Sequence, residues 1–430
     1  MKILVLVTVI LSYLLFFVFP ARRTIVSVAA AALVALFGLI TGTFPVADVA
    51  RAVNWNVMGI FVGTLFLADI FTYSRAPAVL AERMVNRAGS AGSALIAICI
   101  LSSVISAFVE NVATVLIVAP IALAVCDRIK VNPVLPIIAI ALSSNLQGTA
   151  TMIGDPPSMI LAGYANMNFN DFFIYHGRPG IFFAVQVGAL TSFFVLWIMF
   201  RRFTVPVEVE CVEKVRHWIP VILLVAMIVL LALSSFADPA FGHLAGIICM
   251  ILGLLGFVWY VVDCRQPLRE FIRGLDWETA FFLAGIFILV GALTRFGWID
   301  AMATGLQDLI GSNRFLAFCV IVLGSVAISA VVDNVPYLAA MIPLAQRMAE
   351  GFGNTAGSGE VRMLLLFGLL IGSCLGGNIT PVGASANIVG IGILKKRGHS
   401  VSFGEFVRIG LPFTMAAVIP SAVFLWLVWA

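Results

Sequence analysis

Two acidic residues lie deep inside long apolar stretches, and each is followed by Asn and Val. Residues 106–120 read SAFVENVATVLIVAP and residues 329–343 read SAVVDNVPYLAAMIP, so Glu110 in the first copy corresponds to Asp333 in the second. A carboxylate within a bilayer is costly unless it faces a cavity, binds a cation or takes up a proton. We therefore predict that both acids carry exchangeable charge. The alternative is that each acid only caps the helix that follows it, and both roles can hold together.

The asparagine of each copy, Asn111 or Asn334, offers two donors and an acceptor. Such an amide could bind an oxyanion, a neutral hydroxide such as arsenite, or a sodium ion. Alternatively it only makes the hydrogen bond that closes the turn, since a buried amide must be satisfied either way. The sequence leaves both possibilities open, and sodium near these two amides is the one metal site that it suggests.

A second matched pair of segments lies downstream. GTATMIGDPPS at 148–158 and GNITPVGASAN at 377–387 combine glycine, small hydroxyl residues and proline within an apolar run. Glycine permits turns and proline removes a backbone donor, so we predict two broken helices whose ends meet a ligand near the membrane midplane. A kink without a ligand is the alternative. The predicted binding residues in these segments are Thr149, Thr151, Gly154, Asp155, Gly377, Asn378, Thr380, Gly383, Ser385 and Asn387.

Two further acids have no duplicated partner. Ala384 occupies the position that matches Asp155, so Asp155 could cap the second half of its broken helix or carry a proton. Asp69 is a weaker candidate, because an acid near the end of a span can simply reach water.

The composition places these motifs in a membrane. Hydrophobic residues make up 62% of the 430 residues, charged residues 11%, and the mean hydropathy is +1.12, whereas soluble domains are about 25% charged. Several runs exceed the roughly 20 apolar residues that cross a bilayer. The chain is therefore predicted to be a multi-pass membrane protein. Its seven cysteines show no CxxC spacing, so neither a zinc site nor a disulfide framework is indicated.

We predict an all-α fold of about ten transmembrane helices plus two re-entrant hairpins, arranged as two repeats of inverted topology with broken helices at the midplane. Placing Arg22 and Arg23 in a cytoplasmic loop puts most basic residues on that side, as the positive-inside rule expects. The predicted division is an extra N-terminal helix at 1–23, a first repeat at 24–200 with a hairpin at 93–126 and a broken helix at 134–165, a polar linker and connecting helix at 201–243, and a second repeat at 244–430 with a hairpin at 313–349 and a broken helix at 363–394.

The motifs of other function classes are missing from the sequence. It contains no P-loop, no HExxH and no nucleophile elbow. An enzyme is therefore not indicated, and neither ATP-driven transport nor a soluble ATPase partner has support. We expect a small inorganic or organic ion and the lipid bilayer as partners, no nucleic acid, and no cofactor beyond a coupling proton or sodium ion.

Together these residues resemble the ion transporter superfamily that contains the ArsB arsenite permeases, the NhaD sodium/proton antiporters, the melanosomal P protein and the sodium/dicarboxylate symporters. The resemblance is carried by ENV at 110–112, IGDPP at 153–157, VDNVPYLAAMIP at 332–343 and SCLGGNITPVGASANIV at 373–389. It is nearest to the P-protein, ArsB and NhaD branch. The resemblance implies a homodimer in which the hairpins and broken helices move against a fixed scaffold.

The expected function is secondary active transport across the plasma membrane by alternating access. The leading hypothesis is movement of an inorganic ion or metalloid hydroxide, such as arsenite, antimonite or sodium, coupled to protons. A sodium- or proton-coupled carboxylate symporter is the alternative, although the two acidic tips would repel a dianion unless cations neutralised them. A passive anion channel is the alternative from another class.

Overall fold

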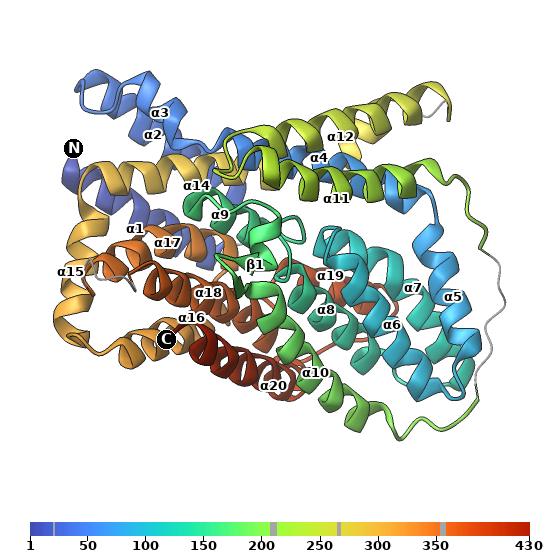
Figure 1. Ribbon diagram of the computed structural model, residues 1–430. Coiled ribbons are helices and arrows are strands. Elements are labelled where there is room, and N and C mark those ends of the chain that lie inside the picture. Colours follow the sequence, from blue (N-terminus) through green and yellow to red (C-terminus); the bar gives the residue numbers. More distant parts are fainter. Residues whose placement is uncertain (20–21, 207–212, 265–267, 353–357) are drawn as a thin grey trace.

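The structure is a computed structural model that describes residues 1–19, 22–206, 213–264, 268–352 and 358–430 (Figure 1). Residues 207–212 of the predicted polar linker lie outside this part of the chain. Apolar runs form helices because a helix satisfies its own backbone donors and acceptors, which lipid cannot do.

The first half of the chain contains α1 (Lys2–Val18), α2 (Arg23–Ile40), α3 (Val46–Ala52), α4 (Trp55–Tyr73), α5 (Ala76–Arg87), α6 (Ala91–Ser106), α7 (Asn111–Ile129), α8 (Val134–Gly148), α9 (Pro156–Ala165), the 3-10 helix η2 (Asn170–Phe172), the antiparallel strands β1 (Ile174–Tyr175) and β2 (Arg178–Pro179), and α10 (Ile181–Phe200). The second half contains α11 (Ile219–Ala237), α12 (Leu244–Val262), α13 (Leu268–Gly274), α14 (Trp277–Arg295), α15 (Trp298–Ile310), α16 (Arg314–Ser329), α17 (Asn334–Glu350), α18 (Ser358–Gly376), η3 (Gly377–Ile379), α19 (Ser385–Lys396) and α20 (Phe403–Trp429).

Most of these helices are suited to a membrane. In the described part of the chain, nine are long and apolar enough to cross it, or ten if the pair α15 and α16, bent by 119°, counts as one span. The predicted all-α membrane fold with about ten transmembrane helices is confirmed. Figure 1 shows α5 and α15 running across the ends of the other helices, at opposite ends of the molecule.

Two helix pairs join the two halves of the chain. In one pair α4 packs against α12, and in the other α2 packs against α14. A Cβ at Gly63 of α4 would lie 2.2 Å from the backbone of Cys249 in α12, and such close approach is typical of small residues between membrane helices. In the other pair, the hydroxyl of Ser27 donates to the carbonyl of Phe282 over 3.0 Å. The beginnings of α2 and α14 therefore lie side by side.

The predicted hairpins at 93–126 and 313–349 correspond to α6 with α7 and to α16 with α17. In each pair the helix stops for four residues, and the last of these is Glu110 or Asp333. The predicted broken helices correspond to α8 with α9 and to α18 with α19, the latter interrupted by η3. The breaks therefore fall where the motifs place them. The opposite orientation of the two copies and the division into repeats stay predictions.

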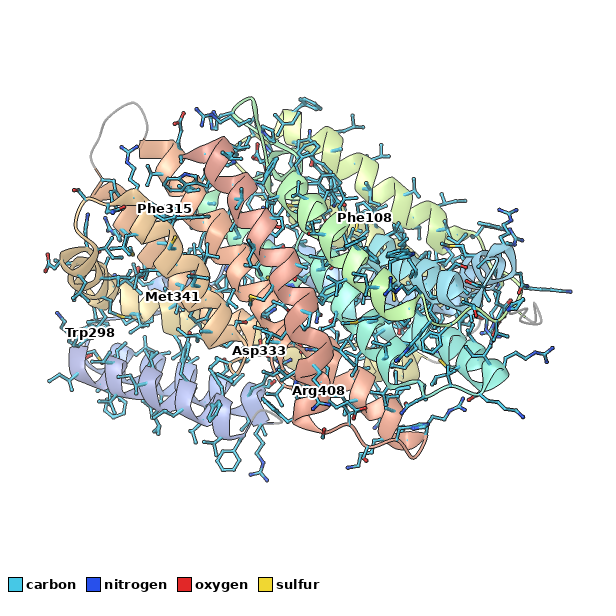
Figure 2. All side chains as sticks on the ribbon, turned by 90° about the horizontal axis from the view of Figure 1, so that it is seen from below. Phe108, Trp298, Phe315, Asp333, Met341 and Arg408 are labelled. Atoms are coloured by element: carbon cyan, nitrogen blue, oxygen red, sulfur yellow. The ribbon has the colours of Figure 1, made fainter. Side chains whose placement is uncertain are left out.

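The N-terminal helix α1 lies along the second copy. Figure 2 shows it running along one side of the molecule between Trp298 and Asp333. At one end the indole Nε1 of Trp298 donates to the carbonyl of Lys2 over 2.9 Å. Towards the other end, the hydroxyl of Tyr13 donates to the carbonyl of Pro336 in the first turn of α17 over 2.7 Å. The extra helix thus supports the turn that holds Asp333.

Candidate functional site

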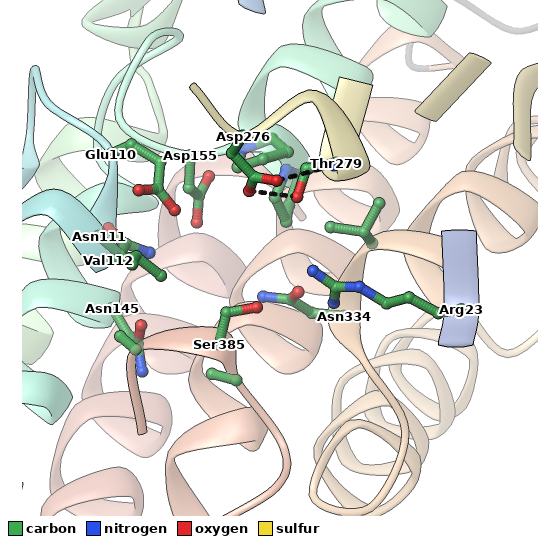
Figure 3. A pocket seen from close by; sticks show the side chains of 15 residues that line it. Arg23, Glu110, Asn111, Val112, Asn145, Asp155, Asp276, Thr279, Asn334 and Ser385 are labelled. Atoms are coloured by element: carbon green, nitrogen blue, oxygen red, sulfur yellow. Dashed lines mark hydrogen bonds between the residues drawn. The ribbon is translucent and has the colours of Figure 1, made fainter. Parts of the chain in front are cut away.

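Among the described residues, six helices begin at one small pocket of about 80 Å³ (Figure 3). These are α2, α7, α9, α14, α17 and α19, and α8 contributes one further residue. Each helix N-terminus carries a partial positive charge from its unpaired N–H groups. The pocket is lined by Arg23, Glu110, Asn111, Val112, Asn145, Asp155, Pro156, Pro157, Asp276, Thr279, Asn334, Val335, Ala384, Ser385 and Ala386.

Four of the six helices are capped by a carboxylate of the chain itself. The capping hydrogen bonds run from the backbone N–H of Ala113 to Glu110 (3.1 Å), of Ser158 to Asp155 (3.1 Å), of Thr279 to Asp276 (3.0 Å) and of Val335 to Asp333 (3.0 Å). Capping is therefore one role of the predicted acids. It also explains their orientation, because a carboxylate held by a first-turn N–H stays at the positive end of its helix. Their part in transport stays a prediction.

The helix α19 lacks such a cap. Its N-cap residue is Ala384, which offers no side-chain acceptor, and Ser385 and Ala386 line the pocket. The N–H groups of this first turn are therefore not occupied by a carboxylate. An anionic group in the pocket would be stabilised at this point.

Arg23 is the one basic residue among the described side chains that line the pocket. Its Nη1 donates to Oδ2 of Asp333, and its guanidinium carbon lies 5.1 Å from the centre of the Phe282 ring. Figure 3 shows Arg23 on the side of the pocket opposite Glu110, with Asn334 between Arg23 and Ser385. The sequence assigned Arg23 to a loop by its charge alone, whereas the structure makes it the first residue of α2 and part of this site.

Three buried amides join the two broken helices, and we call them the amide cluster: Asn145, Asn378 and Asn387. Nδ2 of Asn145 donates to Oδ1 of Asn378 (2.8 Å) and to Oδ1 of Asn387 (3.0 Å). Nδ2 of Asn387 donates to the carbonyls of Gly377 and Thr380, both over 3.0 Å. The side chains of Asn378 and Asn387 therefore form hydrogen bonds within the fold. Asn145 is the member of the cluster that lines the pocket.

The predicted threonines also serve the backbone. The hydroxyl of Thr151 donates to the carbonyl of Ala107, and the hydroxyl of Thr380 donates to the carbonyl of Ala330. These two carbonyls occupy corresponding places at the ends of α6 and α16. The hydroxyl of Thr149 donates to the carbonyl of Asn145 over 3.1 Å. All three hydroxyls satisfy buried acceptors that lipid would leave unpaired.

Within each break, one glycine lies against the backbone of another glycine of the same break. A Cβ at Gly154 would lie 2.3 Å from the carbonyl oxygen of Gly148, and one at Gly383 would lie 2.5 Å from that of Gly377. Neither Gly154 nor Gly383 has a positive φ. Glycine is therefore needed here for close approach of two chain segments, and not for a left-handed turn.

Asn111 is held by serines of the first copy. Its Oδ1 accepts a hydrogen bond from the hydroxyl of Ser106 over 2.5 Å, and its carbonyl accepts one from the hydroxyl of Ser144 over 3.2 Å. A Cβ at Gly148 would lie 2.3 Å from the same Oδ1. The amide thus has a fixed position at the pocket wall.

A second cavity of about 240 Å³ is also lined by Glu110. Its polar lining residues are Asp69, Thr72, Glu110 and Asp276. Glu110 and Asp276 therefore border both cavities, and Asp69 faces the second one.

The structure brings five of the predicted residues to the pocket: Glu110, Asn111, Asp155, Asn334 and Ser385. The others lie behind it, namely Thr149, Thr151, Gly154, Gly377, Asn378, Thr380, Gly383 and Asn387 in the packed breaks and Asp333 in its ion pair with Arg23.

Sequence reasoning missed four polar or charged lining residues: Arg23, Asn145, Asp276 and Thr279. One signal for Asp276 was available, because Asp276-Trp277 corresponds to Asn54-Trp55 at the start of α4. Asn54 caps its helix through the N–H of Val57 in the same way (3.0 Å).

Comparison with protein families gives a match over residues 13–361 to the family described as citrate transporter. An uncharacterized transporter of Mycobacterium tuberculosis is 31% identical over 415 residues, which cover 94% of each chain. The P protein of Mus musculus is 24% identical, over 89% of this chain and 55% of its own length.

Among solved structures, the YdaH transporter of Alcanivorax borkumensis is similar in fold. The TM-score is 0.63 with 14% sequence identity, over 91% of this chain and 87% of that chain. This likeness concerns the fold of a membrane transporter.

Proposed function

Because this chain belongs to the citrate transporter family, it is a multi-pass secondary transporter and not an enzyme, and we propose that it exchanges a small inorganic substrate for protons. The proposed substrate is a sodium ion or a neutral metalloid hydroxide such as arsenite. Glu110 is the proposed proton carrier, with Asp155 and Asp276 beside it.

The observation that carries this proposal is the charge of the pocket. Three carboxylates, those of Glu110, Asp155 and Asp276, line a space of about 80 Å³. The guanidinium that lines it is already paired with a fourth carboxylate, that of Asp333. A site with this balance attracts cations and protons and repels polyanions.

The size of the pocket supports the same proposal. A cavity of about 150 Å³ holds benzene, and citrate has more than twice as many heavy atoms as benzene. The pocket, at about 80 Å³, suits a single ion or a small hydroxide. Amide oxygens of Asn111 and Asn334 and the hydroxyl of Ser385 are the neutral ligands at hand.

Exchange follows from competition for the same carboxylates. A proton on Glu110 removes the charge that holds a cation, and departure of that proton restores it. Because Glu110 also borders the second cavity, we propose that protons approach it from that cavity and the substrate from the pocket. For a neutral hydroxide, the same carboxylates would accept hydrogen bonds from its OH groups.

One observation favours a second candidate, symport of a carboxylate. The open N-terminus of α19 at Ala384, Ser385 and Ala386 is suited to an anionic group. The three nearby carboxylates would then have to be neutralised by protons or sodium ions that travel with the anion.

The test is transport by the purified protein in vesicles with a pH-sensitive dye inside. Sodium, arsenite and citrate are each supplied outside, with and without a proton gradient. Sodium- or arsenite-driven proton movement opposite to the substrate supports the proposal. Citrate uptake together with protons or sodium supports the second candidate. Flux that follows only the ion's own electrochemical gradient would indicate a channel and refute both.

A further inference from the structure

The two carboxylates at the starts of α7 and α17 have the same local geometry. Glu110 accepts the N–H of Ala113 over 3.1 Å, and Asp333 accepts the N–H of Val335 over 3.0 Å. Each is followed by Asn and Val. Sequence symmetry therefore predicts that both carry exchangeable charge.

Their electrostatic partners differ. Asp333 is paired with the guanidinium of Arg23, whereas within the described residues Glu110 makes no ion pair. The titratable and charged groups that share a cavity with Glu110 are Asp155 of α9, Asp276 of α14, Asp69 of α4 and Arg23 of α2. Arg23 is thus the one cation in this group, and it is bonded elsewhere.

The position of Arg23 is fixed by packing on several sides. It begins α2, whose Thr24 and Ser27 donate to the carbonyls of Glu278 and Phe282 over 3.1 and 3.0 Å. The guanidinium lies over the ring of Phe282, an arrangement that favours a cation. The hydroxyl of Tyr13 in α1 donates to the carbonyl of Pro336 in the first turn of α17. A guanidinium stays charged at every accessible pH.

The two copies differ in the helix that supplies the cation. The helix that corresponds to α2 by its packing is α12, which packs on α4 as α2 packs on α14. Its first residue is Leu244 and its N-cap is His243, so the second occurrence of this helix begins without an arginine or a lysine.

We infer that Arg23 is a tethered cation that permanently occupies the charge site at Asp333, so that proton exchange takes place at Glu110 and its neighbours and not at Asp333. This inference rests on the proposed function, since it assigns which carboxylate couples. A carboxylate that already holds a guanidinium gains little from a second cation. Arg23 is a positioning residue, because it acts on exchange through its ion pair with Asp333.

The first experiment needs no transport. The purified protein is treated with dicyclohexylcarbodiimide, which reacts with protonated carboxyl groups in apolar surroundings, and each site is quantified by mass spectrometry. We expect labelling of Glu110 and protection of Asp333. In Arg23→Gln, labelling of Asp333 should rise several-fold, whereas Arg22→Gln, an exposed neighbour, should match the wild type. Equal labelling of both acids in the wild type, or no rise in Arg23→Gln, overturns the inference.

The second experiment measures protons moved per substrate in vesicles. Arg23→Gln frees Asp333 and should raise this ratio by about one proton, and Arg23→Gln combined with Asp333→Asn should restore the wild-type ratio. An unchanged ratio in active Arg23→Gln overturns the inference. If the wild type moves no protons with any substrate, the proposed function fails, and the labelling contrast still decides the state of Asp333.

Folding is controlled separately. If Arg23→Gln is unstable, Arg23→Lys keeps the charge and should preserve the protection of Asp333. Removing one partner leaves a partly buried charge unpaired, so each single variant should melt lower than the double variant. Melting losses that simply add in the double variant would show that the two groups do not act as a pair.

Discussion

Substitution of Gly154 by alanine tests whether the breaks are built by backbone contact. The added Cβ would lie 2.3 Å from the carbonyl oxygen of Gly148 and 2.9 Å from the carbonyl carbon of the same residue. Ordinary contact begins near 3.4 Å, so the two segments would have to separate by about an ångström. The obstacle is backbone on both sides, which cannot rotate away as a side chain can.

The expected size of the effect follows from overpacking. Inserting a methyl group into a packed interior without room costs about 1–3 kcal/mol in the free energy of unfolding. Gly383→Ala should behave similarly, because its Cβ would lie 2.5 Å from the carbonyl oxygen of Gly377. Movement of the break should reduce transport more than stability, since Asp155 caps α9 at the residue after Gly154.

The assay combines thermal unfolding of the detergent-purified variants with transport in vesicles. Gly392→Ala in α19 is the matched control, because nothing lies within 4 Å of its added Cβ and alanine favours a helix by about 1 kcal/mol over glycine. Gly154→Ala with the melting temperature and transport rate of the wild type would refute the contact argument. The breaks would then have to be flexible enough to open by an ångström.

Three further outcomes are expected. Glu110→Gln should keep the fold, because an amide oxygen can still accept the hydrogen bond from the capping N–H. Uptake by this variant should become independent of the proton gradient. Proton coupling retained in vesicles would contradict this expectation. Asn145→Ala should lower the free energy of unfolding by about 2–4 kcal/mol, because both amide partners lose a donor, and denaturant titration measures it. Burial opposes ionisation of Asp238, but hydrogen bonds from three backbone N–H groups in the loop after α11 lower the pKa of its carboxyl. Asp238→Asn should therefore reduce stability above the ordinary pKa of an aspartate, and the difference should vanish as the pH falls through the lowered value, which melting curves across pH would show.

The sequence predicted the membrane fold and the places where helices stop, because those features depend on local patterns. Two acid-Asn-Val motifs and two Gly-rich segments gave the starts of α7 and α17 and the breaks that follow α8 and α18. Hydropathy supplied the spans.

The remaining lining residues depend on packing between distant segments. Arg23 and Asp276 both stand at the ends of apolar runs, where a charged residue ordinarily reaches water, so hydropathy cannot separate them from loop charges. Asn145 lies near the polar end of its helix, and its hydrogen-bond partners are more than 230 residues away in the sequence. Packing between distant segments also explains why Thr151 and Thr380 were predicted as ligands although they do not line the pocket. Their hydroxyls donate to carbonyls at the ends of other helices.

The amide cluster has a mechanical consequence. Asn145 comes from the first broken helix, and both acceptors of its Nδ2 come from the second. Pulling the two breaks apart would leave buried amides without partners in a medium that offers none, so they must travel as one rigid body. If the pocket opens and closes during transport, we expect this body to move relative to the ends of α2 and α14, which also line the pocket.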